Sequence, residues 1–214
     1  VYGYSGSILG SSADIVISDA YQKGIRDFGV GKAYEAMRKA ALAIDIPKEG
    51  FKPRPGTPLY MKYGYCPAES MGEAVSKTIE YAWADDAVSK LAAALGYTED
   101  SALFARRGQN YRNVWNPETQ YFQPRNADGS FVEKFKPLLL TYFDFDEEYT
   151  DDYVEGSALQ WRWSPFFDAP GLFSLFKDTA YFVAELNSFF EKSNPQRGTI
   201  SPGSYYWHGN EPDI

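Results

Sequence analysis

One carboxylate in this 214-residue chain, that of Glu155, lies in a setting suited to acid catalysis. It is followed by residues 156–163, GSALQWRW, which are dense in aromatic rings and hydrogen-bonding groups. Aromatic surroundings keep water away from a carboxyl group and favour its protonated form, which can donate a proton to a leaving group. The alternative interpretation is that Glu155 only caps a helix N-terminus, where the helix dipole favours a negative charge.

A second group of chemically capable side chains lies in residues 205–212, YYWHGNEP. Trp207, His208, Asn210 and Glu211 place a ring, an imidazole, an amide and a carboxylate within five positions. Asn and Glu oxygens suit a hard cation such as calcium, and the same groups can hydrogen-bond sugar hydroxyls. A polar segment with no binding role is the alternative.

The composition excludes several classes of protein. The net charge of −8 argues against a nucleic-acid partner, because such binding needs a dense basic surface. The one cysteine, Cys66, excludes an internal disulfide and a cysteine metal cluster, and the one histidine, His208, excludes two-imidazole metal hydrolases built from this chain alone. No stretch approaches the roughly 20 uninterrupted apolar residues that a membrane span requires.

Apolar residues recur at helical spacing in five segments, which we expect to form helices. The segments are 14–28, 32–44, 70–95, 98–115 and 178–192. Gly96 should end the third helix, and Thr98 and Asp178 should be the N-caps of the last two.

Long irregular segments separate these helices. Residues 47–67 carry five prolines and three glycines, which we expect no helix to tolerate, and residues 116–131 carry two turn signals around a short extended piece. Helices joined alternately by tight turns and long loops predict an all-α fold, part of an (α/α)6 toroid whose long rim loops build a site. About half of such a toroid fits this length, so residues 1–214 should be one partial barrel domain, truncated at both ends.

The sequence resembles the glycoside hydrolase family 92 α-mannosidases, because several motifs occur in the same order over nearly the whole chain. Besides the segments around Glu155 and His208, the matching stretches are 19–28 (DAYQKGIRDF), 33–37 (AYEAM), 75–82 (VSKTIEYA) and 124–130 (PRNADGS).

This resemblance implies an exo-acting, calcium-dependent glycosidase that inverts the anomeric centre of α-mannosides in glycans. Glu155 matches the general acid of the family's Y-x-E-G-x-x-x-Q motif, and His208, Asn210 and Glu211 match the H-G-N-E-P motif that lines the mannose and calcium site. Trp207 and Gln160 are expected to contact the sugar. Asn210 and Glu211 are the expected calcium ligands.

The resemblance also implies partners and a location. Family members carry an N-terminal β-sandwich, and their catalytic-base aspartate lies in a later G-Q-M-S-containing motif that does not occur before Ile214. We therefore expect this segment to work with a mannose-containing oligosaccharide and with the β-sandwich and C-terminal part of the same longer chain, and to be inactive alone. We expect the protein to be periplasmic, secreted or attached to the cell surface.

Departures from the family pattern leave another interpretation open. Ser11-Ser12, residues 157–159 and Phe167 stand where family members commonly have other residues. A non-catalytic helical module that binds mannosides through its aromatic rim would also explain these features, and a purely structural helical domain is a third interpretation.

Overall fold

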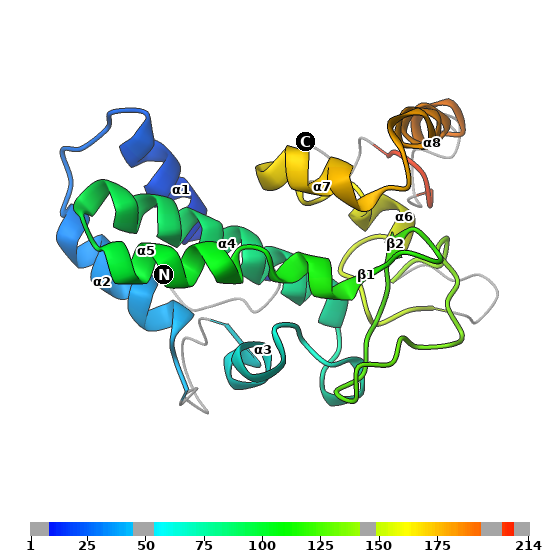
Figure 1. The fold of residues 1–214 in the computed structure, drawn as a ribbon, viewed down its shortest axis with the longest axis horizontal. Helices are drawn as coiled ribbons and strands as arrows, with labels where there is room; N and C mark the ends of the chain where they lie inside the picture. The colour runs from blue at the N-terminus through cyan, green and yellow to red at the C-terminus, as the bar shows by residue number, and fades with distance from the viewer. Residues whose placement is uncertain (1–8, 45–53, 142–148, 194–202, 208–214) are drawn as a thin grey trace. The chain divides into compact units, whose positions relative to one another are not determined.

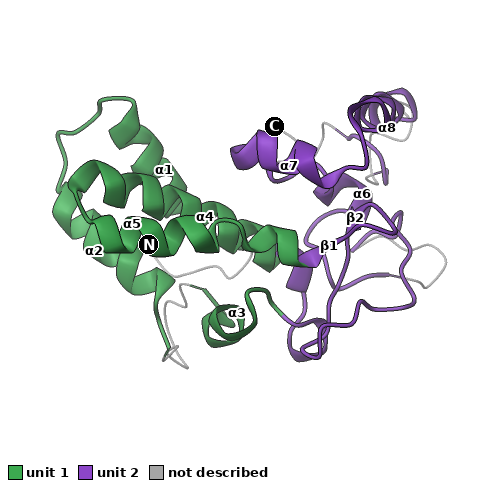
Figure 2. Ribbon diagram, in the orientation of Figure 1, with its two compact units in different colours: residues 1–66, 77–113 green, residues 67–76, 114–214 purple. Residues whose placement is uncertain are grey.

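The computed structural model describes residues 9–44, 54–141, 149–193 and 203–207 (Figure 1). The contacts divide the chain into two compact units, shown in Figure 2. Unit 1 comprises residues 1–66 and 77–113, and unit 2 comprises residues 67–76 and 114–214. Within the described ranges, no helix is both long enough and apolar enough to cross a membrane.

Unit 1 is helical. Its elements are α1 (Ser12–Gln22), α2 (Val30–Ala41), α3 (Thr57–Tyr63), α4 (Ala74–Leu95, the first three residues of which belong to unit 2), α5 (Thr98–Arg107) and the 3-10 turn Asn110–Val114, the last residue of which belongs to unit 2. Its core joins three helices, because Met37 of α2 is buried in one cluster with Leu91 of α4 and Phe104 of α5.

Unit 2 consists of short elements joined by long loops. Its elements are the 3-10 turn Ala68–Ser70, β1 (Trp115–Asn116), β2 (Tyr121–Phe122), α6 (Ala158–Trp161), the 3-10 turn Phe166–Asp168, α7 (Ala169–Leu175) and α8 (Thr179–Glu191). The two strands form an antiparallel hairpin in which Trp115 faces Phe122. This hairpin is the only sheet in the part of the chain that the structure describes, so the all-α class is confirmed.

The expected helices are present, with altered ends. The helix expected over 14–28 ends at Gln22, because Gly24 adopts a left-handed backbone (φ +90°). Gly96 (φ +85°) ends α4 as expected. The helix expected over 98–115 ends at Arg107, and the chain continues into a 3-10 turn and β1.

Two local expectations were wrong and one is confirmed. The proline-rich segment does contain a helix, α3, because Pro58 lies in its first turn, where a missing N–H costs nothing. Tyr97 rather than Thr98 is the N-cap of α5, with no side-chain cap bond. Asp178 caps α8 as expected, since its carboxylate accepts a hydrogen bond from the Tyr181 N–H (2.7 Å).

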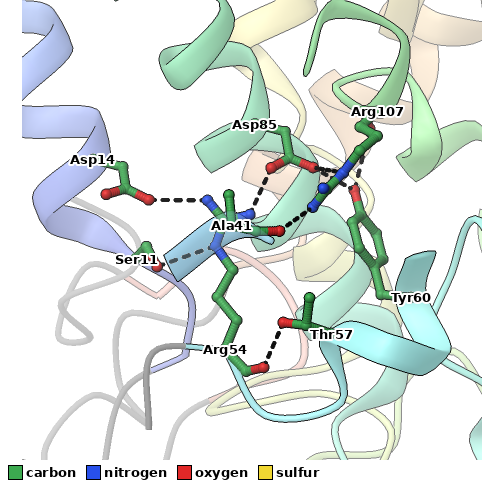
Figure 3. A network of polar contacts seen from close by, with 8 residues as sticks. All are labelled: Ser11, Asp14, Ala41, Arg54, Thr57, Tyr60, Asp85 and Arg107. Atoms are coloured by element: carbon green, nitrogen blue, oxygen red, sulfur yellow. Dashed lines mark hydrogen bonds and ion pairs between the residues drawn. The ribbon is translucent and has the colours of Figure 1, made fainter. Parts of the chain in front are cut away.

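A buried ionic network connects four helices of unit 1 through Arg54, which precedes α3 (Figure 3). Arg54, which is fully buried, donates to Asp14 of α1 (2.9 Å) and to Asp85 of α4 (2.5 Å). The second oxygen of Asp85 accepts from Arg107 of α5 (2.7 Å), and Arg107 also donates to the Ala41 carbonyl of α2 (3.0 Å). Charged groups so deeply buried must be paired, so this network determines how these helices pack.

We predict that Asp85→Asn destabilises the protein by about 3–5 kcal/mol, because it leaves the charges of Arg54 and Arg107 without their shared carboxylate. Lys23→Ala is the control, since its ion pair with Asp19 is exposed and should contribute less than about 1 kcal/mol. Urea unfolding of both variants measures the difference, and equal losses would contradict the prediction.

Candidate functional site

Glu155 lies in a tight turn of unit 2, just before α6. Its backbone adopts φ +48°, in the left-handed region that residues other than glycine rarely occupy. Its side chain is partly exposed, whereas Val154 and Gly156 on either side are buried. A residue in such a strained conformation persists only when the surrounding structure holds it. Residues of this kind are common at functional sites.

The residues before Glu155 are held by hydrogen bonds. The Tyr153 hydroxyl donates to the Phe122 carbonyl of β2 (2.5 Å). The Val154 N–H donates to the Ser76 hydroxyl (3.0 Å), and the Val154 carbonyl accepts from the Trp161 indole N–H (2.8 Å). Three separate segments therefore fix the chain as it enters the turn.

The chain is also held as it leaves the turn. The Thr141 hydroxyl lies 2.8 Å from the Tyr153 carbonyl and 3.0 Å from the Gly156 carbonyl and shares its proton between them. A Cβ at 156 would lie 2.8 Å from Gln160 Oε1, so any larger residue there would have to displace the Gln160 amide.

A capping box starts α6 directly after this turn. The Gln160 N–H donates to Ser157 Oγ (3.3 Å), and Gln160 Oε1 accepts from the Ser157 N–H (2.8 Å). Two N–H groups at the helix N-terminus are thereby satisfied.

The same glutamine reaches a segment more than 40 positions later. Both N–H groups of its side-chain amide are used, because Gln160 Nε2 donates to the carbonyls of Gly203 (3.0 Å) and Tyr205 (2.9 Å). Residues 203–205 therefore lie beside the start of α6.

Two serines reinforce this arrangement. The Ser157 hydroxyl donates to the Ser204 carbonyl (2.9 Å), and the Ser204 hydroxyl donates to the Leu138 carbonyl (2.6 Å). We call these bonds, together with those of Gln160 to Gly203 and Tyr205, the 157/160–203/205 clasp.

Helix α8 supports the next residues of the segment. The Tyr206 ring packs against Phe189 and Phe190, with ring centroids 6.0 and 4.9 Å away. The Lys192 ammonium lies 5.7 Å from the centre of the Tyr205 ring. Trp207, at the end of the described segment, is partly exposed.

The other end of α6 is fixed by a fully buried arginine. Arg162 donates to the Glu185 carboxylate of α8 (2.6 Å) and to the Tyr181 hydroxyl (3.1 Å). Its guanidinium also lies 4.4 Å from the Tyr121 ring centre of β2. Helix α6 is thus attached to both α8 and the hairpin.

The structure brings some of the expected site residues together. Glu155 and Gln160 flank the start of α6, and the clasp holds the segment that leads to Trp207 beside them. His208, Asn210 and Glu211 lie outside the described residues. Among the residues that are described, no group of three or more His, Cys, Asp or Glu side chains could hold a metal ion.

The model of the glycosyl hydrolase family 92 catalytic domain matches residues 2–214. The chain belongs to this family. Its fold is similar to that of a family 92 α-mannosidase from Bacteroides thetaiotaomicron solved with mannoimidazole (28% identity, TM-score 0.83) and to that of a family 92 inverting mannosidase from the same species (30% identity, TM-score 0.82). An uncharacterized secreted glycosidase of Arthroderma benhamiae is 34% identical over 137 residues, which are 60% of this chain.

These relatives are much longer proteins. The alignments cover 97% and 98% of this chain but only 27% and 29% of the two bacterial chains, and the fungal match covers 17% of that protein. The family resemblance and the fold class, part of an α/α toroid, are confirmed. The domain boundaries and the roles of the site residues stay predictions.

Sequence reasoning missed most of the residues that hold the Glu155 turn and α6 in place. The spacing S-x-x-Q at residues 157–160 is a readable capping-box signal and could have been recognised. No local pattern indicates that Thr141 and Ser76 hold the Glu155 turn or that Arg162 attaches α6 to α8, because each contact joins segments far apart in the sequence.

Sequence reasoning also missed an unusual acid in unit 1. Burial raises the pKa of the Glu80 carboxyl on α4 to about 7. A folded pKa above the unfolded value favours the folded state below the unfolded pKa, and this benefit disappears as the pH rises through 7. Ionised Glu80 therefore destabilises the protein at neutral and alkaline pH.

We predict that Glu80→Gln is more stable than the natural protein at pH 8, by up to about 3 kcal/mol, and that the difference vanishes near pH 4.5. Urea unfolding across this pH range measures the effect. Glu35→Gln, at an exposed acid of the same unit, should show no such trend. A difference that stays constant with pH would contradict the assigned cause.

Proposed function

We propose that this chain is part of an exo-acting, calcium-dependent α-mannosidase that hydrolyses α-mannosides of glycans with inversion, and that Glu155 is its general acid. The observation that carries the proposal is the 157/160–203/205 clasp. It holds the residues that lead to Trp207 and the HGNEP motif beside the turn that carries Glu155. Membership of family 92 and the likeness to two bacterial mannosidases support the same activity.

The geometry suits a proton donor. The backbone of Glu155 is held on both sides, while its side chain is partly exposed. In this proposal its carboxyl group donates a proton to the glycosidic oxygen. A fixed acid avoids the loss of rate that even small misplacement causes. In this proposal Trp207 packs against the sugar, and His208, Asn210 and Glu211 complete the site around it.

Inversion needs a second carboxylate. It activates water on the opposite face of the sugar, at about 6.5–9.5 Å from the acid. We place this base in a later part of the longer protein, as the family pattern implies.

Asn210 and Glu211 have the oxygen donors that calcium prefers, and we propose them as its ligands. A calcium ion takes six to eight oxygens, so water, substrate or other residues must supply the rest. When bound, the ion would supply positive charge that orients sugar hydroxyls.

The remaining partners and the location are part of the same proposal. The substrate is a mannose-containing oligosaccharide, and an N-terminal β-sandwich of the longer protein would complete the site. The protein would be exported, either to the periplasm or the cell surface or as a secreted protein. The fungal relative, which is described as secreted, supports export.

We predict that Glu155→Gln in the full-length protein lowers kcat on a methyl α-mannoside by about 10²–10⁴-fold, because the leaving alcohol then lacks its proton donor. Activity on a dinitrophenyl α-mannoside should fall much less, since that leaving group departs without protonation. Glu133→Gln, at an exposed acid of the same unit, is the control and should retain normal rates on both. Equal losses on the two substrates would contradict the role of Glu155.

We also expect the isolated 214 residues to show no measurable turnover of an aryl α-mannoside, with or without calcium, since they lack the proposed base. Saturable binding of mannobiose to the full-length protein without any product would instead favour the binding-module interpretation. Turnover by the 214 residues at the rate of the full-length protein would show that the base has been misplaced.

A further inference from the structure

We propose that Gln160 is a positioning residue, which holds residues 203–205 against the turn of Glu155, rather than a direct sugar contact. This inference rests on the proposed function, in which Glu155 and the segment after Trp207 serve one sugar. It assigns to the last residue of the Y-x-E-G-x-x-x-Q motif a role in the geometry of that site.

The first argument is that both N–H donors of the Gln160 amide are already used. Its oxygen accepts from the Ser157 N–H, and its two N–H groups donate to the carbonyls of Gly203 and Tyr205. A sugar hydroxyl could receive a hydrogen bond from this amide only by displacing one of those carbonyls. Such a displaced carbonyl would lose its partner in a partly buried place, which costs free energy.

The short length of α6 is the second argument. A helix of four residues is too short to be stable by itself and depends on its cap and its tertiary contacts. Gln160 provides both, because its side chain completes the capping box and also donates hydrogen bonds to residues 203 and 205. Movement of residues 203–205 and fraying of α6 are therefore coupled.

The route to Glu155 is the third argument. Gly156 lies between Glu155 and the capping box, with the site of its missing Cβ only 2.8 Å from Gln160 Oε1. A shift of the Gln160 side chain would therefore affect the Glu155 turn as well as residues 203–205. Gln160 thus sets the distance between the proton donor and the residues that lead to the sugar-binding motif.

Gln160→Glu in the full-length protein tests this inference. Glutamate keeps the oxygen that accepts from Ser157, so the cap persists, but it loses the two N–H donors to residues 203 and 205. Hydrogen exchange without any substrate reports on the segment itself, and steady-state kinetics on an aryl α-mannoside report on the site.

We expect amide exchange in residues 203–207 to become at least about ten-fold faster, while exchange in α4 stays unchanged. We also expect kcat to fall by about 10²-fold, because the acid and the bound sugar are no longer aligned. Ser204→Ala, which loosens the clasp from the other side by removing the bond to Leu138, should change both readouts in the same direction but less.

The matched control is Gln120→Glu. Gln120 makes a comparable bridge elsewhere in unit 2, donating to the Pro117 carbonyl (2.8 Å) and accepting from the Lys177 N–H (2.9 Å). It should leave exchange at 203–207 and kcat unchanged.

Unchanged exchange at 203–207 in Gln160→Glu, with activity lost, would identify Gln160 as a sugar contact and overturn the inference. Faster exchange with unchanged kcat would also overturn it. If the natural full-length protein showed no mannosidase activity, the proposed function would fail, while the exchange result would still decide whether Gln160 holds the segment.

Discussion

The cost of removing a guanidinium from water is the constraint on which both compact units depend. Each unit contains a fully buried arginine, Arg54 in unit 1 and Arg162 in unit 2. Such a charge is tolerated only when carboxylates or other acceptors surround it. The acceptors come from segments far away in the sequence, Asp14 and Asp85 for the first arginine and Glu185 for the second. Pairing the charge therefore also sets which helices pack together.

In unit 2 this constraint leads directly to the site. Arg162 attaches the C-terminal end of α6 to α8, and the capping box holds its N-terminal end. Between them they stabilise a helix of four residues, which serves as the common support for the Glu155 turn and for residues 203–205. The strained backbone of Glu155 is tolerated because hydrogen bonds hold the residues on both sides of it.

The Y-x-E-G-x-x-x-Q motif can now be understood residue by residue. Tyr153 anchors the turn to β2 through the Phe122 carbonyl. Gly156 leaves room for the side chain of Gln160, which joins the turn to the later segment. Glu155 is the one member of the motif that we assign to chemistry, and the other three set its position.

The sequence by itself determined the helical class, the main helices and the residues with catalytic potential, because apolar spacing and residue type are local properties. It also carried the family resemblance that the family match confirmed. Only the tertiary structure decided that a helix forms with Pro58 in its first turn, that Asp85 joins two arginines, and that Gln160 bonds to residues 203 and 205. These features depend on contacts between segments that are distant along the chain, and no local pattern encodes which buried polar groups will meet.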